Sequence, residues 1–428
     1  MKILHINTYD RGGAANACLR LHEGLLNAGI DSKVLVLYKT DNRLPEVYAY
    51  EAEIKKRAFF TRLKIKVQRI LKEFKLYKEK RVLQDSDVER QHLMNLRPKG
   101  LEMISFPEKD IDITNNKYFL EADIIHLHWI ADFFDYRIFF DKCKKIIVWT
   151  FHDQNPFLGV EHYAEVLLHP DNQGYPTIRQ FDEYEIEIDK KYKKIKYEIF
   201  KNTPINIIAL CNWMKNEILN SRMFPLAKID IIPNGIDSKQ FKCLNKKFCR
   251  ELLNLPLDKK IILFVADSID NNRKGMSYLF PVIERMKQED FILCSIGYKQ
   301  DLKFDNVNHY DLDRIQDQRL MNVAYCAVDF FVIPSLMDNL PNTVLEALLS
   351  GTPIIAFPVG GLPDMIENGK NGYLAENVSV EALTKSINYF FEQGIAYDVE
   401  KIREEAITQF DIHVQVENIL EYYNIILG

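Results

Sequence analysis

The segment from residue 330 to residue 372 constrains the fold more than any other part of this chain, and it reads FFVIPSLMDNLPNTVLEALLSGTPIIAFPVGGLPDMIENGKNG. A continuous apolar run at Phe330–Ile333 predicts a buried strand, and the loop after it carries Asp338. Pro341 then opens a short helix that has Glu346 on its flank. Apolar strands that alternate with helices are typical of parallel sheets with both faces covered, so the segment predicts an α/β fold.

The start of the expected helix has the properties of an anion-binding site. Pro341 suits the first turn because its missing N–H would have no helical partner there. The amides left free at this helix start are those of Leu340, Asn342 and Thr343. Such amides attract phosphate, and the carboxylates of Asp338 and Glu346 accept hydrogen bonds from hydroxyl groups. A nucleoside-diphosphate sugar offers the matching groups in order: sugar hydroxyls, a diphosphate and ribose hydroxyls.

This stretch resembles the donor-site signature of the family-four retaining glycosyltransferases, which have the GT-B fold. The matching positions are Pro334-Ser335, Glu346-Ala347, Ser350-Gly351, Pro353 and Gly360-Gly361. The family's first acid is usually glutamate, whereas this chain has Asp338 there, with the same charge on a shorter side chain. The resemblance implies that Asp338 meets hydroxyls of the donor sugar, that Glu346 meets those of the ribose, and that Asn339 also lies in the donor site.

The resemblance also implies an architecture and a reaction. The fold would be α/β, with two Rossmann-like, doubly wound parallel-sheet domains facing a cleft and a C-terminal helix at 412–428 crossing back to the first domain. The enzyme would transfer a hexosyl group, with retention, from a nucleoside-diphosphate sugar to a glycan or lipid-linked saccharide, in capsule, O-antigen or exopolysaccharide biosynthesis. Because the family is described as reacting on one face of the sugar, no residue is assigned as a covalent nucleophile. Neither a metal nor another cofactor is expected.

Two places in the chain begin the same alternation of strand and helix. The first strand, Lys2–Asn7, leads through Gly12-Gly13 to a helix at Asn16–Ala28, and the second start is the apolar run Lys260–Ala266. Two starts predict two Rossmann-like domains. Further strands are expected at Ser32–Leu37, Ile124–His128, Ile146–Phe151, Phe291–Ile296 and Ile354–Phe357.

The expected domains are residues 1–204 and 205–411, because the apolar run Ile205–Leu210 is taken as the start of the second domain. Two stretches break the alternation. One is a basic helical insertion at 54–82, and the other is an irregular segment at Gln84–Asn116. Ligands of such folds bind beyond the carboxyl ends of the strands, where all the candidate residues lie.

Glycines and cations follow two of the expected strands. Gly12-Gly13 lets the backbone approach a ligand closely, and its position resembles the family's glycine-rich loop that faces the donor phosphate. A tight turn without a ligand is the alternative. Arg273 and Lys274 place two positive charges beside the expected diphosphate, which gains negative charge as it leaves. For this pair, a solvated basic turn is the alternative.

The run Trp149-Thr150-Phe151-His152-Asp153 resembles the WTxHD stretch of a bacterial branch of the family. The resemblance implies that His152 donates a hydrogen bond to the donor sugar and that Asp153 orients it or contacts the acceptor. A satisfied core histidine is the alternative. His126 and His128 share one face of a strand, but without a third acid or thiol they predict no metal site. His128 is a candidate acceptor contact.

Composition and charge exclude some functions. A net charge of −5 and a pI near 6.1 disfavour nucleic-acid binding over the whole surface. The seven cysteines form no Cys-x-x-Cys pair, which indicates reduced thiols in the cytoplasm. No run reaches the ~18 apolar residues of a membrane-spanning helix. The basic segment 54–82 has an apolar stripe, which predicts peripheral contact with anionic lipid on the inner face of the cell membrane, or else packing on its own domain.

Two other classes of function fit the same residues. One is a different GT-B enzyme, either a sugar-nucleotide epimerase acting without an acceptor or a glycan phosphorylase that needs inorganic phosphate. The other is a non-catalytic nucleotide-sugar-binding protein, suggested by the aspartate at position 338. It would bind the donor without turnover.

Overall fold

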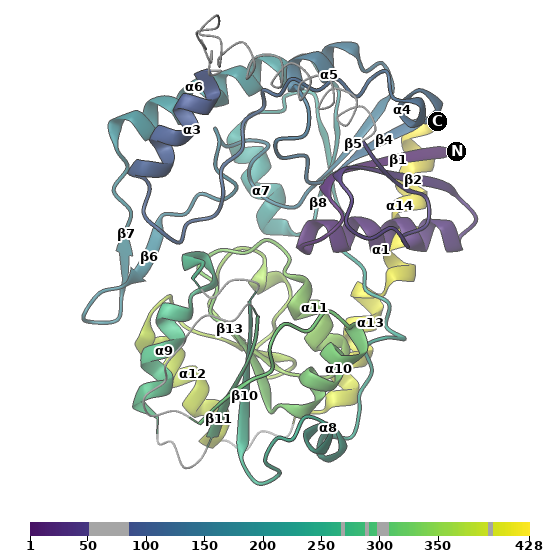
Figure 1. Cartoon of the computed structure of the whole chain (residues 1–428). Helices are drawn as coiled ribbons and strands as arrows, with labels where there is room; N and C mark the ends of the chain where they lie inside the picture. The colour runs from purple at the N-terminus through teal and green to yellow at the C-terminus, as the bar shows by residue number, and fades with distance from the viewer. Residues whose placement is uncertain (51–84, 267–269, 287–290, 298–307, 393–396) are drawn as a thin grey trace, which may run out of the picture.

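The computed structural model describes residues 1–50, 85–266, 270–286, 291–297, 308–392 and 397–428. They form two α/β domains, one above the other in Figure 1, each built on a parallel sheet. The basic segment expected at 54–82, with its predicted lipid contact, lies outside the described residues. Within the described ranges, no helix combines the length and the apolar character needed to cross a bilayer.

The first domain contains a seven-stranded parallel sheet in the order β3-β2-β1-β4-β5-β8-β9. Its strands are β1 (Lys2–Tyr9), β2 (Asp31–Tyr38), β3 (Val47–Ala49), β4 (Ile124–Leu127), β5 (Ile146–Phe151), β8 (Asn206–Ala209) and β9 (Lys228–Ile231). The strands are apolar runs that can be buried on both faces, such as IIVWTF in β5. The helices described between them are α1 (Gly13–Asn27), α3 (Asp85–Leu96), α4 (Lys117–Glu121), α5 (Tyr136–Lys142), α6 (Glu183–Phe200) and α7 (Asn212–Ser221).

The second domain contains a six-stranded parallel sheet in the order β12-β11-β10-β13-β14-β15. Its strands are β10 (Lys260–Ala266), β11 (Phe291–Gly297), β12 (His309–Asp311), β13 (Phe330–Ile333), β14 (Ile354–Ala356) and β15 (Gly372–Leu374). The connecting helices are α8 (Lys246–Leu252), η1 (Asn272–Lys274), α9 (Met276–Arg285), α10 (Gln318–Ala327), α11 (Asn342–Leu349), η2 (Leu362–Asp364), α12 (Val380–Glu392) and α13 (Val399–Phe410). In both sheets the strand order reverses beside the first strand, which is the predicted doubly wound arrangement.

The last helix, α14 (Ile412–Leu427), packs on the first domain, as expected. In Figure 1 this yellow helix lies beside α1. Its Ile419 and Tyr423 share a hydrophobic cluster with Ile3 of β1 and Leu21 of α1. Because apolar burial stabilises a fold by ~25 cal/mol per Å², this helix is an integral part of the first domain.

The chain crosses between the domains twice, and the two crossings are bonded to each other. The Ile236 amide donates to the carbonyl oxygen of Phe410 at 2.8 Å, and the Ile412 amide donates to the carbonyl oxygen of Ile236 at 3.0 Å. A Cβ on Gly235 would lie 2.8 Å from the Cα of Ile412. Glycine therefore allows the two crossings to approach this closely.

The domain boundary predicted between residues 204 and 205 is wrong. β8 pairs with β5, and β9 pairs with β8, so both strands belong to the first sheet. The apolar pattern of Ile205–Leu210 identifies a strand but not its sheet, because strands of both domains are buried on both faces. The first domain continues to the crossing at Ile236.

Three local expectations also change. α1 begins at Gly13 rather than Asn16, because Gly12 has a φ of 96° and its carbonyl oxygen accepts from the Asn16 amide at 2.9 Å. The segment expected to be irregular at Gln84–Asn116 contains α3. Pro341 is the residue before the helix rather than its first residue, since α11 begins at the next position.

An antiparallel hairpin, β6 (Leu167–Pro170) and β7 (Pro176–Ile178), extends from the first domain onto the second, on the side opposite α14 in Figure 1. The Tyr278 hydroxyl of α9 donates to the carbonyl oxygen of Leu168 at 2.6 Å. The Val380 amide, at the start of α12, donates to the carbonyl oxygen of Gly174 at 2.9 Å. The hairpin thus fastens the two domains a second time.

The seven cysteines are all free thiols, and all except Cys243 are buried. They contribute mainly to packing, as the scattered pattern predicted.

Candidate functional site

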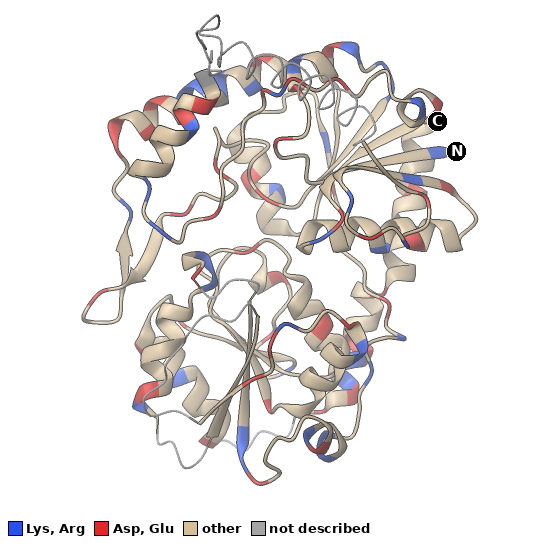
Figure 2. Ribbon diagram, in the orientation of Figure 1, with Lys and Arg blue, Asp and Glu red and all other residues tan. Residues whose placement is uncertain are grey.

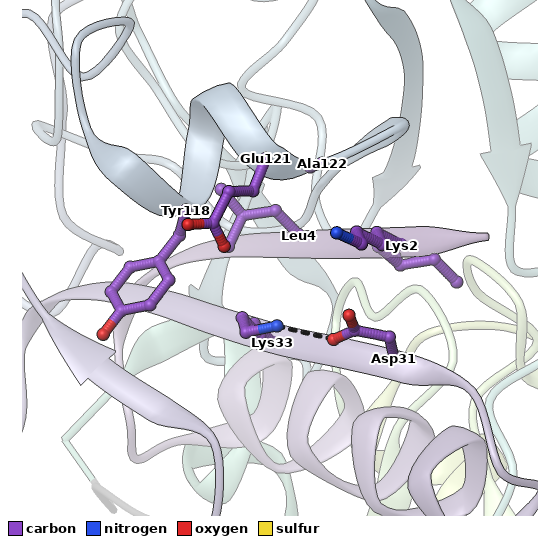
Figure 3. Close-up of a pocket in the computed structure, with 8 residues that line it drawn as sticks. Lys2, Leu4, Asp31, Lys33, Tyr118, Glu121 and Ala122 are labelled. Carbon is purple, nitrogen blue, oxygen red and sulfur yellow. Dashed lines mark hydrogen bonds and ion pairs between the residues drawn. The ribbon is translucent and has the colours of Figure 1, made fainter.

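A shallow hollow at the start of β1 and β2 is the first surface feature to consider (Figure 3). Its lining residues are Lys2, Ile3, Leu4, Asp31, Lys33, Tyr118, Glu121 and Ala122. Ligands of doubly wound sheets bind at the carboxyl ends of the strands, whereas this hollow lies at the amino ends. The candidate site is therefore at the other end of the sheet.

Predicted groups from both domains meet at the carboxyl ends of the two sheets. Asn339, which follows Asp338, donates from its side-chain amide to the carbonyl oxygen of Phe151 at 2.9 Å. Asn342, the first residue of α11, donates from its side chain to the carbonyl oxygen of Gly13 at 3.0 Å. The loop after β13 therefore faces both the end of β5 and the glycine turn after β1.

Glycines allow the loop after β13 to pack this closely. A Cβ on Gly360 would lie 1.8 Å from the carbonyl oxygen of Asp338, and one on Gly361 would lie 1.9 Å from that of Asn339. No side chain fits in either place. The paired glycines of the sequence pattern are thus explained by the shape of the loop that carries Asp338.

Asp338 is the centre of a buried ion cluster. Its Oδ2 accepts from Lys274 Nζ at 2.8 Å and from Ser335 Oγ at 3.2 Å, and its Oδ1 lies 3.2 Å from Arg273 Nη1. Burial alone would raise the pKa of Asp338, but the charges of Lys274 and Arg273 outweigh it and hold that pKa below its ordinary value. Asp338 is therefore ionised at neutral pH, with both oxygens paired.

Arg273 extends this cluster into the first domain. Its Nη2 donates to Glu102 Oε2 at 2.9 Å and its Nη1 to the carbonyl oxygen of Met337 at 3.0 Å. The guanidinium also lies 4.3 Å from the centre of the Tyr163 ring. Arg273 is buried among these partners, so the predicted direct contact with the diphosphate would require it to share or exchange one of them, and that contact stays a prediction. Lys274 is the more exposed of the two cations.

Glu102 and Glu165 belong to this cluster, although the sequence analysis did not select them. The Glu102 amide donates to Glu165 Oε1 at 2.7 Å. Burial would raise the pKa of Glu102, but Arg273 brings it to about 2. Burial raises the pKa of Glu165 to about 7, and its Oε2 is buried without a partner among the described residues. No local pattern marks these loop acids, since only contact between distant segments brings them to Arg273.

Glu346 is held by Arg20 of α1, which the sequence analysis also missed. Arg20 Nη2 donates to Glu346 Oε1 at 2.8 Å, and the Tyr325 hydroxyl donates to Oε2 at 3.3 Å. Arg20 Nε and Nη1 are buried and have no partner in the described part of the chain. Arg20 lies seven residues, or about two helical turns, after Gly13, so the two share one face of α1. That spacing was the signal in the sequence that could have identified Arg20 as a site residue.

A row of imidazoles leads from the first sheet to His152. His5 Nδ1 lies 3.0 Å from His128 Nε2, and His128 Nδ1 lies 3.1 Å from His152 Nε2. Burial lowers the pKa of all three, that of His152 to about 4, so the rings are neutral at pH 7. His128 is 3% exposed with both nitrogens engaged, an arrangement that disfavours the predicted acceptor contact, which stays a prediction. It lies behind His152.

Three buried imidazoles, those of His5, His126 and His128, are close enough to be tested as metal ligands. The ligand atoms of His5, His126 and His128 lie within 4.8 Å of one another. His126, however, has Nδ1 2.5 Å from the Tyr423 hydroxyl and Nε2 2.8 Å from Thr150 Oγ1. The rings of His126 and His128 are stacked with centres 4.2 Å apart, so their lone pairs run side by side instead of converging. The geometry fits hydrogen bonding better than metal ligation.

Asp153 supports the loop after β5. Its Oδ2 accepts from Trp129 Nε1 at 2.7 Å and lies 2.5 Å from His162 Nδ1, while its Oδ1 accepts from the Asn155 amide at 2.9 Å. Asp153 is buried and both of its oxygens are paired, so in this structure it holds Trp129, Asn155 and His162; its predicted roles toward the donor sugar and the acceptor stay predictions. Lys, Arg, Asp and Glu are interspersed over the ribbon of both domains (Figure 2), so the described chain has mixed charge.

Both halves of the chain match family models of glycosyltransferases. Residues 11–240, more than half of the chain, match the family model described as Glycosyltransferase Family 4. Residues 259–393 match the model described as Glycosyl transferases group 1.

Curated relatives come from bacteria and plants. The chain is 25% identical over 255 residues to UDP-Gal:alpha-D-GlcNAc-diphosphoundecaprenol alpha-1,3-galactosyltransferase of Escherichia coli, covering 55% of this chain and 65% of that protein. It is 28% identical over 189 residues to Sulfoquinovosyl transferase SQD2 of Arabidopsis thaliana, covering 41% of this chain and 36% of that protein. In each case, the match spans less than two thirds of the relative.

Solved structures match over nearly the whole chain. Sucrose-phosphate synthase from Thermosynechococcus elongatus has a TM-score of 0.65 at 17% identity, covering 100% of this chain and 99% of that one. Anabaena Alr3699/HepE in complex with UDP-glucose has a TM-score of 0.61 at 16% identity, covering 99% of both chains. WaaG, a glycosyltransferase involved in lipopolysaccharide biosynthesis, has a TM-score of 0.61 at 14% identity, covering 97% and 98%. These likenesses confirm the GT-B fold.

Proposed function

This chain belongs to glycosyltransferase family 4, and on that premise we propose that it transfers a hexosyl group from a nucleoside-diphosphate sugar to a glycan or lipid-linked saccharide. The reaction we infer retains the anomeric configuration and serves the biosynthesis of a cell-surface polysaccharide. The observation that carries the proposal is the meeting of the Asp338–Glu346 segment with Gly12-Gly13 and the end of β5 across the domain interface.

Each part of such a donor has a matching group in the chain. Lys274 and the free amides at the start of α11 suit the diphosphate. Glu346 suits the ribose hydroxyls, while Asp338 and His152 suit the hydroxyls of the sugar. Because Glu346 is paired with Arg20 in the free chain, ribose hydroxyls would have to share or replace that partner.

The proposed reaction breaks the bond between the anomeric carbon and the diphosphate oxygen, and its electron pair stays on the leaving diphosphate. The acceptor oxygen forms the new bond to the anomeric carbon on the same face, and its proton passes to a leaving phosphate oxygen. Lys274 and the α11 amides would stabilise the charge that develops on the diphosphate. The protein would contribute position and electrostatics.

Relatives suggest a uridine nucleotide as the first donor to test. The name of the Escherichia coli relative specifies UDP-Gal, and the Anabaena protein has been solved with UDP and with UDP-glucose. The acceptor would be a saccharide on a lipid carrier or a free glycan.

The donor class can be tested with a thermal-shift series of nucleoside diphosphates and nucleotide sugars. A ligand at 100 times its Kd stabilises the folded state by about 2.7 kcal/mol, so one nucleotide should raise the unfolding temperature clearly. The corresponding nucleotide sugar should then be consumed only when a saccharide acceptor is present. Turnover without an acceptor would indicate an epimerase, dependence on inorganic phosphate a phosphorylase, and binding without turnover a non-catalytic protein.

Transfer is also expected to persist in excess EDTA. The reason is that positive charge for the diphosphate comes from Lys274 and the α11 amides, with Arg273 behind them. The measurement is the initial rate of nucleotide release with and without chelator. A rate that disappears in EDTA and returns with Mg²⁺ or Mn²⁺ would show that a metal ion carries the leaving group instead.

A further inference from the structure

The imidazoles of His5, His128 and His152 form a hydrogen-bonded row whose two ends differ. The ring centres are 5.2 Å apart for the first pair and 5.4 Å for the second, with interplanar angles of 36° and 25°. With N···N distances of 3.0 and 3.1 Å, both contacts are hydrogen bonds. At one end, His152 is partly exposed. At the other end, His5 Nε2 is buried and has no partner among the described residues.

Only two arrangements of protons satisfy both bonds when the rings are neutral, because a neutral imidazole has one N–H. In the first arrangement, His5 donates from Nδ1 to His128, His128 donates from Nδ1 to His152, and His152 carries its own proton on Nδ1. In the second, His152 donates from Nε2 to His128, His128 donates from Nε2 to His5, and His5 carries its proton on Nε2. The ring nitrogen that carries the proton on His5 therefore determines which nitrogen carries it on His152.

The buried end selects between these arrangements. In the second, His5 would bury an N–H without an acceptor, whereas in the first it buries only a lone pair. Buried N–H groups without an acceptor are rarer in proteins than acceptors that lack a donor. The neighbouring rings supply no acceptor, since His22 is bonded to Ser32 Oγ and the Pro45 carbonyl oxygen, and His126 to two hydroxyls. The first arrangement is favoured.

His152 lies beside the loop that carries Asp338. The preceding residue, Phe151, accepts from Asn339 through its carbonyl oxygen. The carbonyl oxygen of His152 itself accepts from the Tyr163 hydroxyl at 3.4 Å, and the Tyr163 ring packs on Arg273. Because these contacts pack the end of β5 against the loop after β13, a proton on His152 Nδ1 would be a fixed donor for a sugar hydroxyl bound at this interface.

We propose that His128, oriented in turn by His5, is a positioning residue that holds His152 as the Nδ1-protonated tautomer, so that it presents a hydrogen-bond donor to the donor sugar. The use of that donor in transfer rests on the proposed function. The tautomer itself is a property of the free protein, and it can be measured without any substrate.

The test is the imidazole ¹⁵N spectrum of ¹⁵N-histidine-labelled protein at neutral pH, with the His152 signals assigned by their loss in His152→Gln. In the wild type we expect a protonated Nδ1 and a bare Nε2 on His152. His128→Leu removes the ring that donates to His152 Nε2 and should give a mixed or inverted tautomer, whereas His128→Gln, whose amide can still donate to His152, should keep the wild-type pattern. His126→Gln is the matched control, because His126 is equally buried on the same face but lies outside the row.

Transfer kinetics give the second readout. His128→Leu should lower kcat roughly tenfold, the usual effect of losing one hydrogen bond, and His128→Gln should recover it. A wild-type His152 protonated on Nε2 would overturn the proposal, and that spectrum decides even if His128→Leu does not fold. An unchanged tautomer in folded His128→Leu would overturn it as well. If the wild type shows the expected tautomer but transfers no sugar, the proposed function fails while the positioning of His152 stands.

Discussion

Replacing Arg273 by methionine is expected to lower the free energy of unfolding by about 3–5 kcal/mol at neutral pH. That is the cost typical of removing one partner from a buried ion pair, because the remaining charge stays buried. Here the remaining charges are the carboxylates of Glu102 and Asp338, with only Lys274 to balance them. The measurement is urea unfolding followed by circular dichroism.

Two controls separate this effect from a general loss of charge. Lys246→Met removes a partly exposed partner of Asp329, and such pairs contribute only about 0–1 kcal/mol. The double variant Glu102→Gln, Arg273→Met should be more stable than Arg273→Met alone, because it buries one unpaired charge fewer. An Arg273→Met protein within about 1 kcal/mol of the wild type would contradict a buried ion cluster.

The pH dependence of this effect has a definite sign. Arg273 holds the pKa of Glu102 at about 2, below its ordinary value of 4.5. The stabilisation from this pair is therefore complete above pH 4.5 and is lost as the pH falls toward 2. The stability gap between the wild type and Arg273→Met should narrow over the same range.

Glu346→Ala is expected to lose most transfer activity and to remain folded, with a lower free energy of unfolding because Arg20 stays buried without its partner. Losing a charged hydrogen-bond partner costs about 1.5–3 kcal/mol, which lowers the rate by roughly ten to more than a hundred times. The measurement combines transfer rates with the thermal shift produced by the donor nucleotide. Intact circular dichroism would show that the loss is local.

Arg20→Met is the matched control for Glu346, because the two side chains are bonded to each other. If Glu346 acts only by joining the domains through Arg20, the single variants and the double variant should lose equal activity. If Glu346 binds the ribose, nucleotide affinity should fall further in Glu346→Ala than in Arg20→Met. Wild-type nucleotide affinity in Glu346→Ala would rule out the ribose assignment.

Most of the fold could be predicted because its elements are continuous in sequence. β5, β10 and β13 occur at the expected residues, and α14 crosses back over the expected range. Each is a long apolar or amphipathic run bounded by polar residues. The boundary between the domains could not be predicted in this way. β8 is a short buried strand that would suit either sheet, and only its pairing with β5 assigns it to the first.

In the candidate ion-pair network, only the residues of the second domain could be predicted from the sequence. Asp338, Glu346 and Lys274 lie in local patterns, so a strand, a helix start and a glycine turn identify them. Arg20, the partner of Glu346, and Glu102, the partner of Arg273, come from the other domain, more than a hundred residues away in sequence. No periodicity connects residues so far apart. The same is true of His5, whose effect on His152 passes through a third ring on another strand.

The paired crossings at Ile236 and Asp411 also determine how the two domains can move. These segments form a parallel β-bridge, so they twist together as one ribbon. Two domains joined by a single strand could rotate independently, whereas two crossings bonded to each other restrict relative rotation and sliding of the domains. A movement that separates the domains on the opposite side would have to break the hydrogen bonds that the β6–β7 hairpin makes to α9 and to the start of α12.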